Sequence, residues 1–168
     1  MPPLHTAAYN ADFEAVRRLL AAGVLPDLRD DAGYTALLWA SFRAAVADQV
    51  PIIEALIAAG ADPDATNSSS DSSCLILAAQ CGCESAISAL VAGGANVDRQ
   101  ADGVTALMVA ARMGQVGVVR LLLELGANPA TRDGRFTAAD YARRSGHDEL
   151  ADLLDRSTTA WPPPGHNR

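Results

Sequence analysis

The chain has 168 residues, of which 49% are hydrophobic and 20% are charged, and its formal net charge is -7. This composition supplies enough apolar material for one folded domain and excludes an intrinsically disordered chain. The negative charge would repel nucleic acid and anionic membranes, and no stretch reaches the roughly 18 apolar residues of a membrane span. We therefore expect no nucleic-acid partner and no membrane association.

An alanine-centred segment recurs five times along the chain, first as Leu4-His5-Thr6-Ala7-Ala8. Its anchoring alanines are Ala7, Ala40, Ala78, Ala110 and Ala142, and successive ones lie 33, 38, 32 and 32 residues apart. Repetition at a nearly fixed period indicates a repeat protein, in which each repeat forms one supersecondary unit. Because aromatic residues make up only 5% of the chain, small and aliphatic side chains must build the core, which favours closely packed helices.

A second segment, out of phase with the first, ends four times in glycine. It reads Leu19-Leu20-Ala21-Ala22-Gly23, Leu56-Ile57-Ala58-Ala59-Gly60, Leu90-Val91-Ala92-Gly93-Gly94 and Leu122-Leu123-Glu124-Leu125-Gly126. Glycine adopts the left-handed conformation that closes a helix at low steric cost, so each segment is predicted to end a second helix. Helices this short are not stable alone, and neighbouring units must stabilise them.

These segments together resemble the ankyrin repeat family. The family's turn is present in Asp30-Asp31-Ala32-Gly33-Tyr34-Thr35 and Asp102-Gly103-Val104-Thr105, its inter-helix turn in Gly146-His147, and its second-helix core in Val118-Val119 with Leu122-Leu123. The resemblance covers about residues 2–155. It implies an all-α solenoid of stacked helix-turn-helix units joined by β-hairpin-like loops.

We expect one ankyrin-repeat domain over residues 1–156 and a flexible, proline-rich, extended tail over residues 157–168. The five units are predicted at about residues 1–29, 30–66, 67–99, 100–131 and 132–156. The first is a shortened N-cap, and the last is a capping unit whose polar residues face water, namely Asp148, Glu149, Asp152 and Asp155.

Two departures from the repeat are expected to alter the stack locally. Four extra residues around 41–51 in the second unit are predicted to lengthen its first helix or the following turn, giving a protrusion. The loop at residues 64–73 is about two residues longer than its counterparts, and it is expected to be the most mobile or least regular hairpin.

The cysteines, histidines and hairpin aspartates are better explained by structural roles than by catalysis or metal binding. Cys74, Cys81 and Cys83 fall short of the four ligands of a structural zinc site, with no histidine nearby. The resemblance assigns His5 and His147 to the family's two habitual histidines, which hydrogen-bond neighbouring loops. Hairpin aspartates usually bond their own turn backbone, and no calcium-site spacing or nucleophile elbow is present. We therefore expect no enzyme, no cofactor and no metal.

The two tryptophans are each open to two interpretations. Trp39 occupies a position that is apolar in other units (Leu77 and Val109), so core packing is favoured over partner contact. Trp161 precedes Pro162-Pro163-Pro164, which gives a polyproline ligand as the alternative to a solvated tail; the solvated tail is favoured.

The resemblance implies a partner-binding surface made of the hairpin tips and the exposed face of the first helices. The predicted contact residues are Tyr9, Asn10, Asp31, Ala32, Tyr34, Phe42, Arg43, Ser69, Ser70, Ser72, Gln80, Ala101, Asp102, Val104, Arg112 and Met113. Six of these belong to types enriched at interface centres and form the predicted hot spot: Tyr9, Tyr34, Phe42, Arg43, Arg112 and Met113. Because the whole chain is acidic while Arg43 and Arg112 point to the concave side, the expected partner presents acidic side chains there and basic ones to the hairpins.

The predicted function is non-enzymatic protein binding through this concave surface. The alternative is a regulatory or neutralising accessory subunit of an enzyme or toxin encoded nearby. The few, clustered cysteines favour a reducing, cytoplasmic compartment, and the absence of lysine among abundant arginine and alanine suggests a bacterial coding sequence. We expect a monomer.

Overall fold

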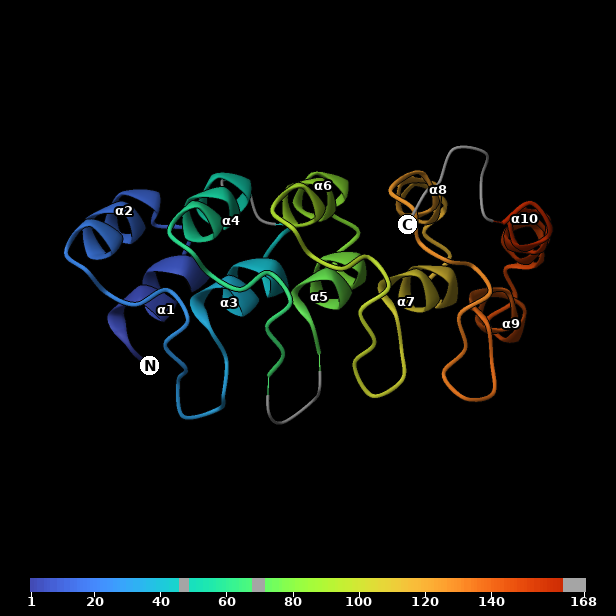
Figure 1. Cartoon of the computed structure of the whole chain (residues 1–168), viewed down its shortest axis with the longest axis horizontal. Coiled ribbons are helices and arrows are strands. Elements are labelled where there is room, and N and C mark those ends of the chain that lie inside the picture. The colour runs from blue at the N-terminus through green and yellow to red at the C-terminus, as the bar shows by residue number, and fades with distance from the viewer. Residues whose placement is uncertain (46–48, 68–71, 162–168) are drawn as a thin grey trace.

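The computed structural model describes residues 1–45, 49–67 and 72–161. Helices form two parallel layers in it (Figure 1). The inner layer contains α1 (Pro3–Tyr9), α3 (Ala36–Phe42), α5 (Cys74–Gln80), α7 (Ala106–Arg112) and α9 (Ala138–Arg144). The outer layer contains α2 (Phe13–Ala21), α4 (Gln49–Ala58), α6 (Glu84–Ala92), α8 (Val116–Glu124) and α10 (Asp148–Thr159).

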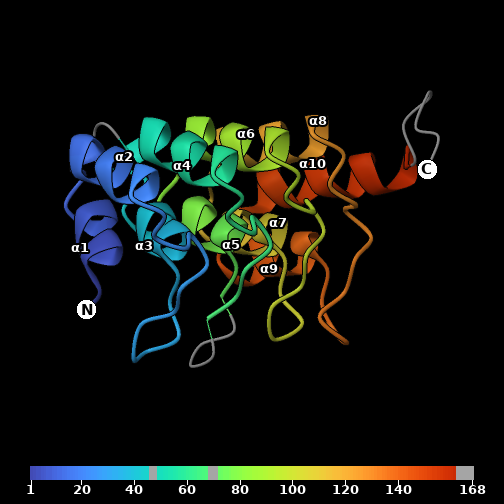
Figure 2. The same ribbon diagram turned by 60° about the vertical axis from the view of Figure 1, so that its left-hand side comes forward.

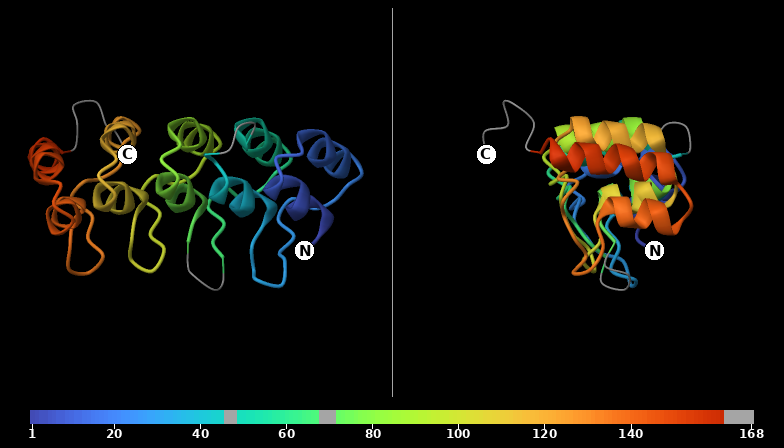
Figure 3. Two further views of the ribbon diagram at one scale, coloured as in Figure 1. Left: turned by 180° about the vertical axis from the view of Figure 1, so that it is seen from behind. Right: turned by 90° about the vertical axis from the view of Figure 1, so that its right-hand side faces the viewer.

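Long loops project from the inner layer to one side of the molecule (Figure 2). Seen along the stack, they leave the helices at an angle, so each unit has an L-shaped outline (Figure 3, right). The predicted all-α solenoid of stacked helix pairs is therefore confirmed. We call the side of the inner helices that faces the hairpins the concave surface.

A hydroxyl side chain starts four of the inner helices. Thr35, Ser73, Thr105 and Thr137 each precede the helix in an extended conformation, and each accepts a hydrogen bond from the amide three residues later. Such N-caps satisfy an amide that has no partner within the helix and stabilise a helix by about 1 kcal/mol. The repeated Thr or Ser thus fixes where each seven-residue helix begins.

Small side chains let the inner helices approach each other. Ala40, Ala78, Ala110 and Ala142 have no solvent-exposed surface, and each inner helix packs against the next one along the stack. Leucine and isoleucine from the outer helices, including Ile53, Ile87, Leu90 and Leu122, complete one continuous core. The core therefore runs through the whole stack and is not divided among separate units.

A ladder of hydrogen bonds also joins the loops that follow the outer helices. Asp27 Oδ1 accepts from the amide of Asp62 at 2.9 Å, Asp64 Oδ1 from Asn96 at 2.9 Å, and Asp98 Oδ1 from Asn128 at 2.8 Å. The glycines before these loops have φ between 83° and 98°, which confirms the predicted left-handed helix closures at Gly23, Gly60, Gly94 and Gly126. Carboxylate and glycine together set the register of consecutive units.

The insertion in the second unit lies in the turn and does not extend the first helix. α3 has seven residues, like the other inner helices. Six residues separate Phe42 from Gln49 where other units have three, and the fourth extra residue lies in α4, which has 10 residues where α2, α6 and α8 have 9. The Gln49 amide nitrogen donates to the Ala8 carbonyl at 2.9 Å, which ties the end of this turn to the first unit. Residues 46–48 of the insertion lie outside the described residues.

The expected extended tail is wrong at its start, because α10 continues to Thr159. Hydroxyls of Ser157, Thr158 and Thr159 donate to carbonyls four residues earlier at 2.9 to 3.0 Å, and the first proline after α10 is Pro162. The polar cap is as expected, with Asp148, Glu149, Asp152 and Asp155 exposed. In the 64–73 loop, Thr66 bridges to Ser73, and residues 68–71 lie outside the described residues.

Substitution of a core leucine in the middle of the stack should destabilise the whole domain. Leu90 is fully buried, so Leu90→Ala is expected to lower the free energy of unfolding by about 3 kcal/mol in urea titrations followed by circular dichroism. The control is Val116→Ala, because the Val116 side chain is 46% exposed. This substitution should change the free energy of unfolding by less than about 0.5 kcal/mol. Equal effects of both substitutions would contradict the continuous core.

Candidate partner-binding surface

The last residue of each inner helix contributes to one row across the concave surface. This helix-end row consists of Tyr9, Phe42, Gln80, Arg112 and Arg144. Tyr9 is half-buried and the other four are exposed, although Phe42 is a large apolar residue with 45% exposure. The residues change along the row from aromatic in the first two units to cationic in the last two.

Four aromatic side chains meet at the N-terminal end of the row. The Trp39 ring stacks on Tyr34 with a centroid distance of 4.5 Å, and Tyr9 and Phe42 approach it edge-on at 5.4 and 6.0 Å. The Arg43 guanidinium lies over the Tyr9 ring, 4.8 Å from its centroid. We call Tyr9, Tyr34, Trp39, Phe42 and Arg43 the N-terminal aromatic cluster; edge-on and stacked pairs of this kind hold their rings in fixed orientations.

Asp30 holds the cluster in place from the hairpin. Its Oδ2 accepts from the Trp39 indole Nε1 at 2.8 Å, and its Oδ1 accepts from the amides of Ala32 and Tyr34 at 3.0 and 2.9 Å. Burial raises the pKa of Asp30, but the hydrogen bonds from Trp39, Tyr34 and Ala32 outweigh it, so that the pKa is below its ordinary value. The Asp30 carboxylate thus fixes the orientation of the Trp39 side chain.

The favoured assignment of Trp39 to the core is wrong. Its side chain is only half-buried and lies at the centre of the aromatic cluster, whereas Leu77 and Val109 at the equivalent positions are buried. The indole N–H needs an acceptor, and Asp30 beside the turn supplies one at the surface. The acidic residue preceding the turn was the sequence signal that could have indicated this position.

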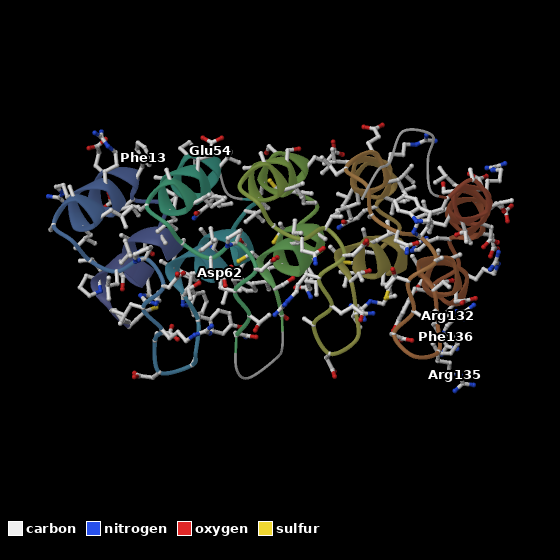
Figure 4. All side chains as sticks on the ribbon, viewed as in Figure 1. Phe13, Glu54, Asp62, Arg132, Arg135 and Phe136 are labelled. Carbon is white, nitrogen blue, oxygen red and sulfur yellow. The ribbon has the colours of Figure 1, made fainter. Side chains whose placement is uncertain are left out.

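A second cluster, which the sequence interpretation missed, lies on the fifth unit. The Phe136 ring lies 6.2 Å from Tyr141, and the guanidiniums of Arg135 and Arg144 lie over it at 5.0 and 4.6 Å. Phe136 and Arg135 project from the last hairpin (Figure 4). We call Phe136, Tyr141, Arg135 and Arg144 the C-terminal cluster. Phe136 and Tyr141 stand at the repeat positions of Tyr34 and Trp39, so comparison of units could have predicted it.

Asp133 anchors the C-terminal cluster as Asp30 anchors the other one. Its oxygens accept from the amides of Phe136 and Arg135 at 2.7 and 2.8 Å and from the Tyr141 hydroxyl at 2.5 Å. The amide of Phe136, followed by the Tyr141 hydroxyl and the Arg135 amide, lowers the pKa of Asp133 to about 2. The same contact with Asp133 raises the pKa of the Tyr141 hydroxyl.

The other predicted contact residues differ in accessibility. Asn10, Asp31, Ala32, Gln80, Asp102, Arg112 and Met113 are exposed, whereas Ser72 and Val104 are half-buried. Ala101 is buried and its amide and carbonyl both bond to Val104, so its predicted contact role is not supported. Ser69 and Ser70 lie outside the described residues. Contact of these residues with a partner stays a prediction.

The histidines and cysteines lie within the packing of the stack. His5 is buried and its Nε2 lies 3.0 Å from the Tyr34 carbonyl, which confirms the expected contact with a neighbouring loop, and the His147 ring packs closely over Gly114. Burial raises the pKa of the Cys74 thiol to about 12, and Cys81 Sγ donates to the Phe42 carbonyl at 3.1 Å. The described part of the chain contains no group of three or more histidine, cysteine or acidic residues placed to hold a metal ion.

Residues 1–67 and 41–133 match the family described as ankyrin repeats (3 copies), and the chain belongs to this family. It is 32% identical over 162 residues to the Ankyrin repeat and KH domain-containing protein mask-1 of Caenorhabditis elegans, a match that covers 95% of this chain and 6% of the relative. It is 47% identical over 62 residues to the human ARF GTPase-activating protein GIT1, covering 36% of this chain and 8% of that protein. The chain thus spans less than a tenth of each of these relatives.

None of the helices within the described residues has the length and apolar character needed to cross a membrane.

The Asp133 contacts should make stability depend on pH in acid. A carboxyl whose pKa is lowered on folding stabilises the protein at pH values above its ordinary pKa of 3.8. That contribution is lost as the pH falls toward the folded-state pKa of about 2. Wild type should therefore melt at a higher temperature than Asp133→Asn at pH 6, and the difference should shrink between pH 4 and 2. A difference that is unchanged over this interval would contradict the assignment.

Proposed function

We propose that this protein binds a partner protein through the concave surface, without catalytic turnover. The observation that carries the proposal is the half-exposed N-terminal aromatic cluster, in which Trp39 is held by Asp30 at 2.8 Å and Phe42 is 45% exposed. Aromatic and arginine side chains in a fixed orientation lose little conformational freedom on binding, which is why they dominate interface energies.

Core shielding alone gives a poorer account of this cluster. At the equivalent positions in the third unit, Gln80 ends the helix and Leu77 is buried, and that unit packs without any aromatic ring. Stacking of units therefore does not require Trp39 or Phe42. Exposed apolar side chains grouped together, with polar neighbours such as Asn10 and Arg43, are typical of interaction sites.

The hydrogen bonds of the described polar groups support a binding role better than a catalytic one. His5 contacts the Tyr34 carbonyl, and the hairpin carboxylates Asp30 and Asp133 accept amide and aromatic donors. At the N-terminal end, a groove of about 580 Å³ includes Asp12, whose Oδ1 caps α2 by accepting from Ala15. A general base needs a free lone pair that a substrate can reach. The carboxylates of Asp12, Asp30 and Asp133 accept from backbone amides, and the second ring nitrogen of His5 has no partner but is buried with the rest of its side chain.

We also propose a reducing, cytoplasmic setting and a monomeric state. The three cysteines are unpaired thiols, and Cys74 is fully buried between units, which suits a compartment that does not form disulfides. The polar residues of α10 close the C-terminal end of the stack against another copy.

Removal of exposed apolar side chains from the concave surface should abolish capture of the partner from lysate of the source cells. Phe42→Ala combined with Met113→Ala removes side chains that are 45% and 48% exposed, so folding should be unaffected. The control is Leu25→Ala combined with Val116→Ala, which removes equally apolar side chains, 71% and 46% exposed, from a loop and from the outer layer.

A protein retained by wild type and by the control, but lost from the concave variant, is the expected result. Retention of the same proteins by both variants would refute the proposed surface. If the captured protein is an enzyme or toxin encoded beside this chain, the accessory-subunit role becomes the specific form of the function.

A further inference from the structure

A stretch of the fourth and fifth units, before the acidic helix α10, is basic within an acidic protein. Residues 104–147 contain six arginines and three carboxylates, although the whole chain carries -7. Three of these arginines gather at the concave surface. The guanidiniums of Arg135 and Arg144 lie over the Phe136 ring, 5.0 and 4.6 Å from its centroid. Arg112 ends α7, which packs against α9, and its charge acts on Tyr141 of α9.

The carboxylates of this region do not neutralise the three arginines. Asp133 is engaged by Phe136, Arg135 and Tyr141 through amide and hydroxyl donors. Asp140 caps α9 through Thr137 at 2.9 Å and, with Asp155, pairs with Arg143. Within the described residues, the ion pairs of the fifth unit involve Arg143, and none involves Arg112, Arg135 or Arg144.

We propose that Arg112, Arg135 and Arg144 bind a short acidic segment of the partner protein, an inference that rests on the proposed function. A guanidinium presents its donors in a planar fork that matches a carboxylate, and a ring under it holds the fork in position. Arg144 has this arrangement over Phe136. Arg112 stands one unit away in the same row and supplies the second charge.

The rest of the row defines the orientation of that segment. Gln80 separates the arginines from Phe42 and the N-terminal aromatic cluster. The acidic part of the segment therefore lies over the fourth and fifth units, and an apolar or aromatic side chain lies over the first and second. An extended strand suits this path, because its alternate side chains point to one surface.

Charge complementarity favours an acidic protein segment over nucleic acid. A polyanion interacts with the field of the entire protein, and a net charge of -7 opposes its approach. A segment with few carboxylates experiences mainly the nearby arginines, because screening limits the field to about 8 Å at physiological salt. The basic region is thus suited to a small number of carboxylates.

The test is fluorescence anisotropy with a short labelled peptide, one half rich in glutamate and the other carrying leucine and phenylalanine. A second peptide has lysine in place of glutamate, and an oligouridine of similar length is the third probe. The proteins are wild type, Arg112→Glu/Arg144→Glu, and the matched control Arg120→Glu/Arg156→Glu. The control changes the net charge equally, on exposed residues of the outer helices α8 and α10.

The acidic peptide should bind wild type and the control alike, and the concave variant should bind about tenfold more weakly or worse. Added salt should weaken binding, and the lysine peptide should not bind. No binding of the acidic peptide, equal loss in both variants, or preferential binding of oligouridine would overturn the proposal. If a captured partner depends on Phe42 and Met113 but not on Arg112 and Arg144, the proposed function holds and the acidic segment is refuted.

Discussion

Close packing of each helix pair against the next is the interaction on which this structure depends. Among the described residues, no helix of the stack is long enough to be stable alone, and the longest of them, α10, has 12 residues. Alanines in the inner layer, with no exposed surface, let neighbouring helices approach, and the aspartate ladder from Asp27 to Asn128 fixes the loops in the same register. A repeat protein of this kind gains its stability at the contacts between units.

The stacking requirement leaves the concave positions free to differ. The same position of the inner helix holds Trp39, Leu77, Val109 and Tyr141 in successive units, and only the two with a polar tip find an aspartate in the hairpin. At each end of the stack, an aspartate therefore orients an aromatic side chain beside an arginine. The aromatic and arginine side chains proposed to bind the partner are therefore concentrated at these two ends, with Gln80 between them.

Much of the fold could be predicted from the sequence because the repeated signals are local. Threonine or serine precedes four of the inner helices, glycine follows four of the outer helices, and alanine recurs at a nearly fixed spacing. Each of these signals has one physical explanation that applies in every unit where it occurs. The candidate surface was less predictable. The apolar residues at the equivalent positions of other units predict a buried Trp39, which the structure contradicts. The polar residues of the last unit predict a cap and give no indication of the contact between Phe136 and Arg144. The orientation and exposure of these side chains depend on contacts with hairpin residues, and the spacing of residues along the sequence does not reveal such contacts.

The most direct test of the account is photo-crosslinking with p-benzoylphenylalanine placed at Gln80, in the middle of the helix-end row, and separately at Arg120 on the outer helix α8. Both side chains are exposed, so neither replacement should disturb folding. The account predicts that the partner crosslinks to position 80 and not to position 120. Crosslinking from position 120 alone would place the partner on the outer layer and contradict the central claim that the concave surface is the binding surface.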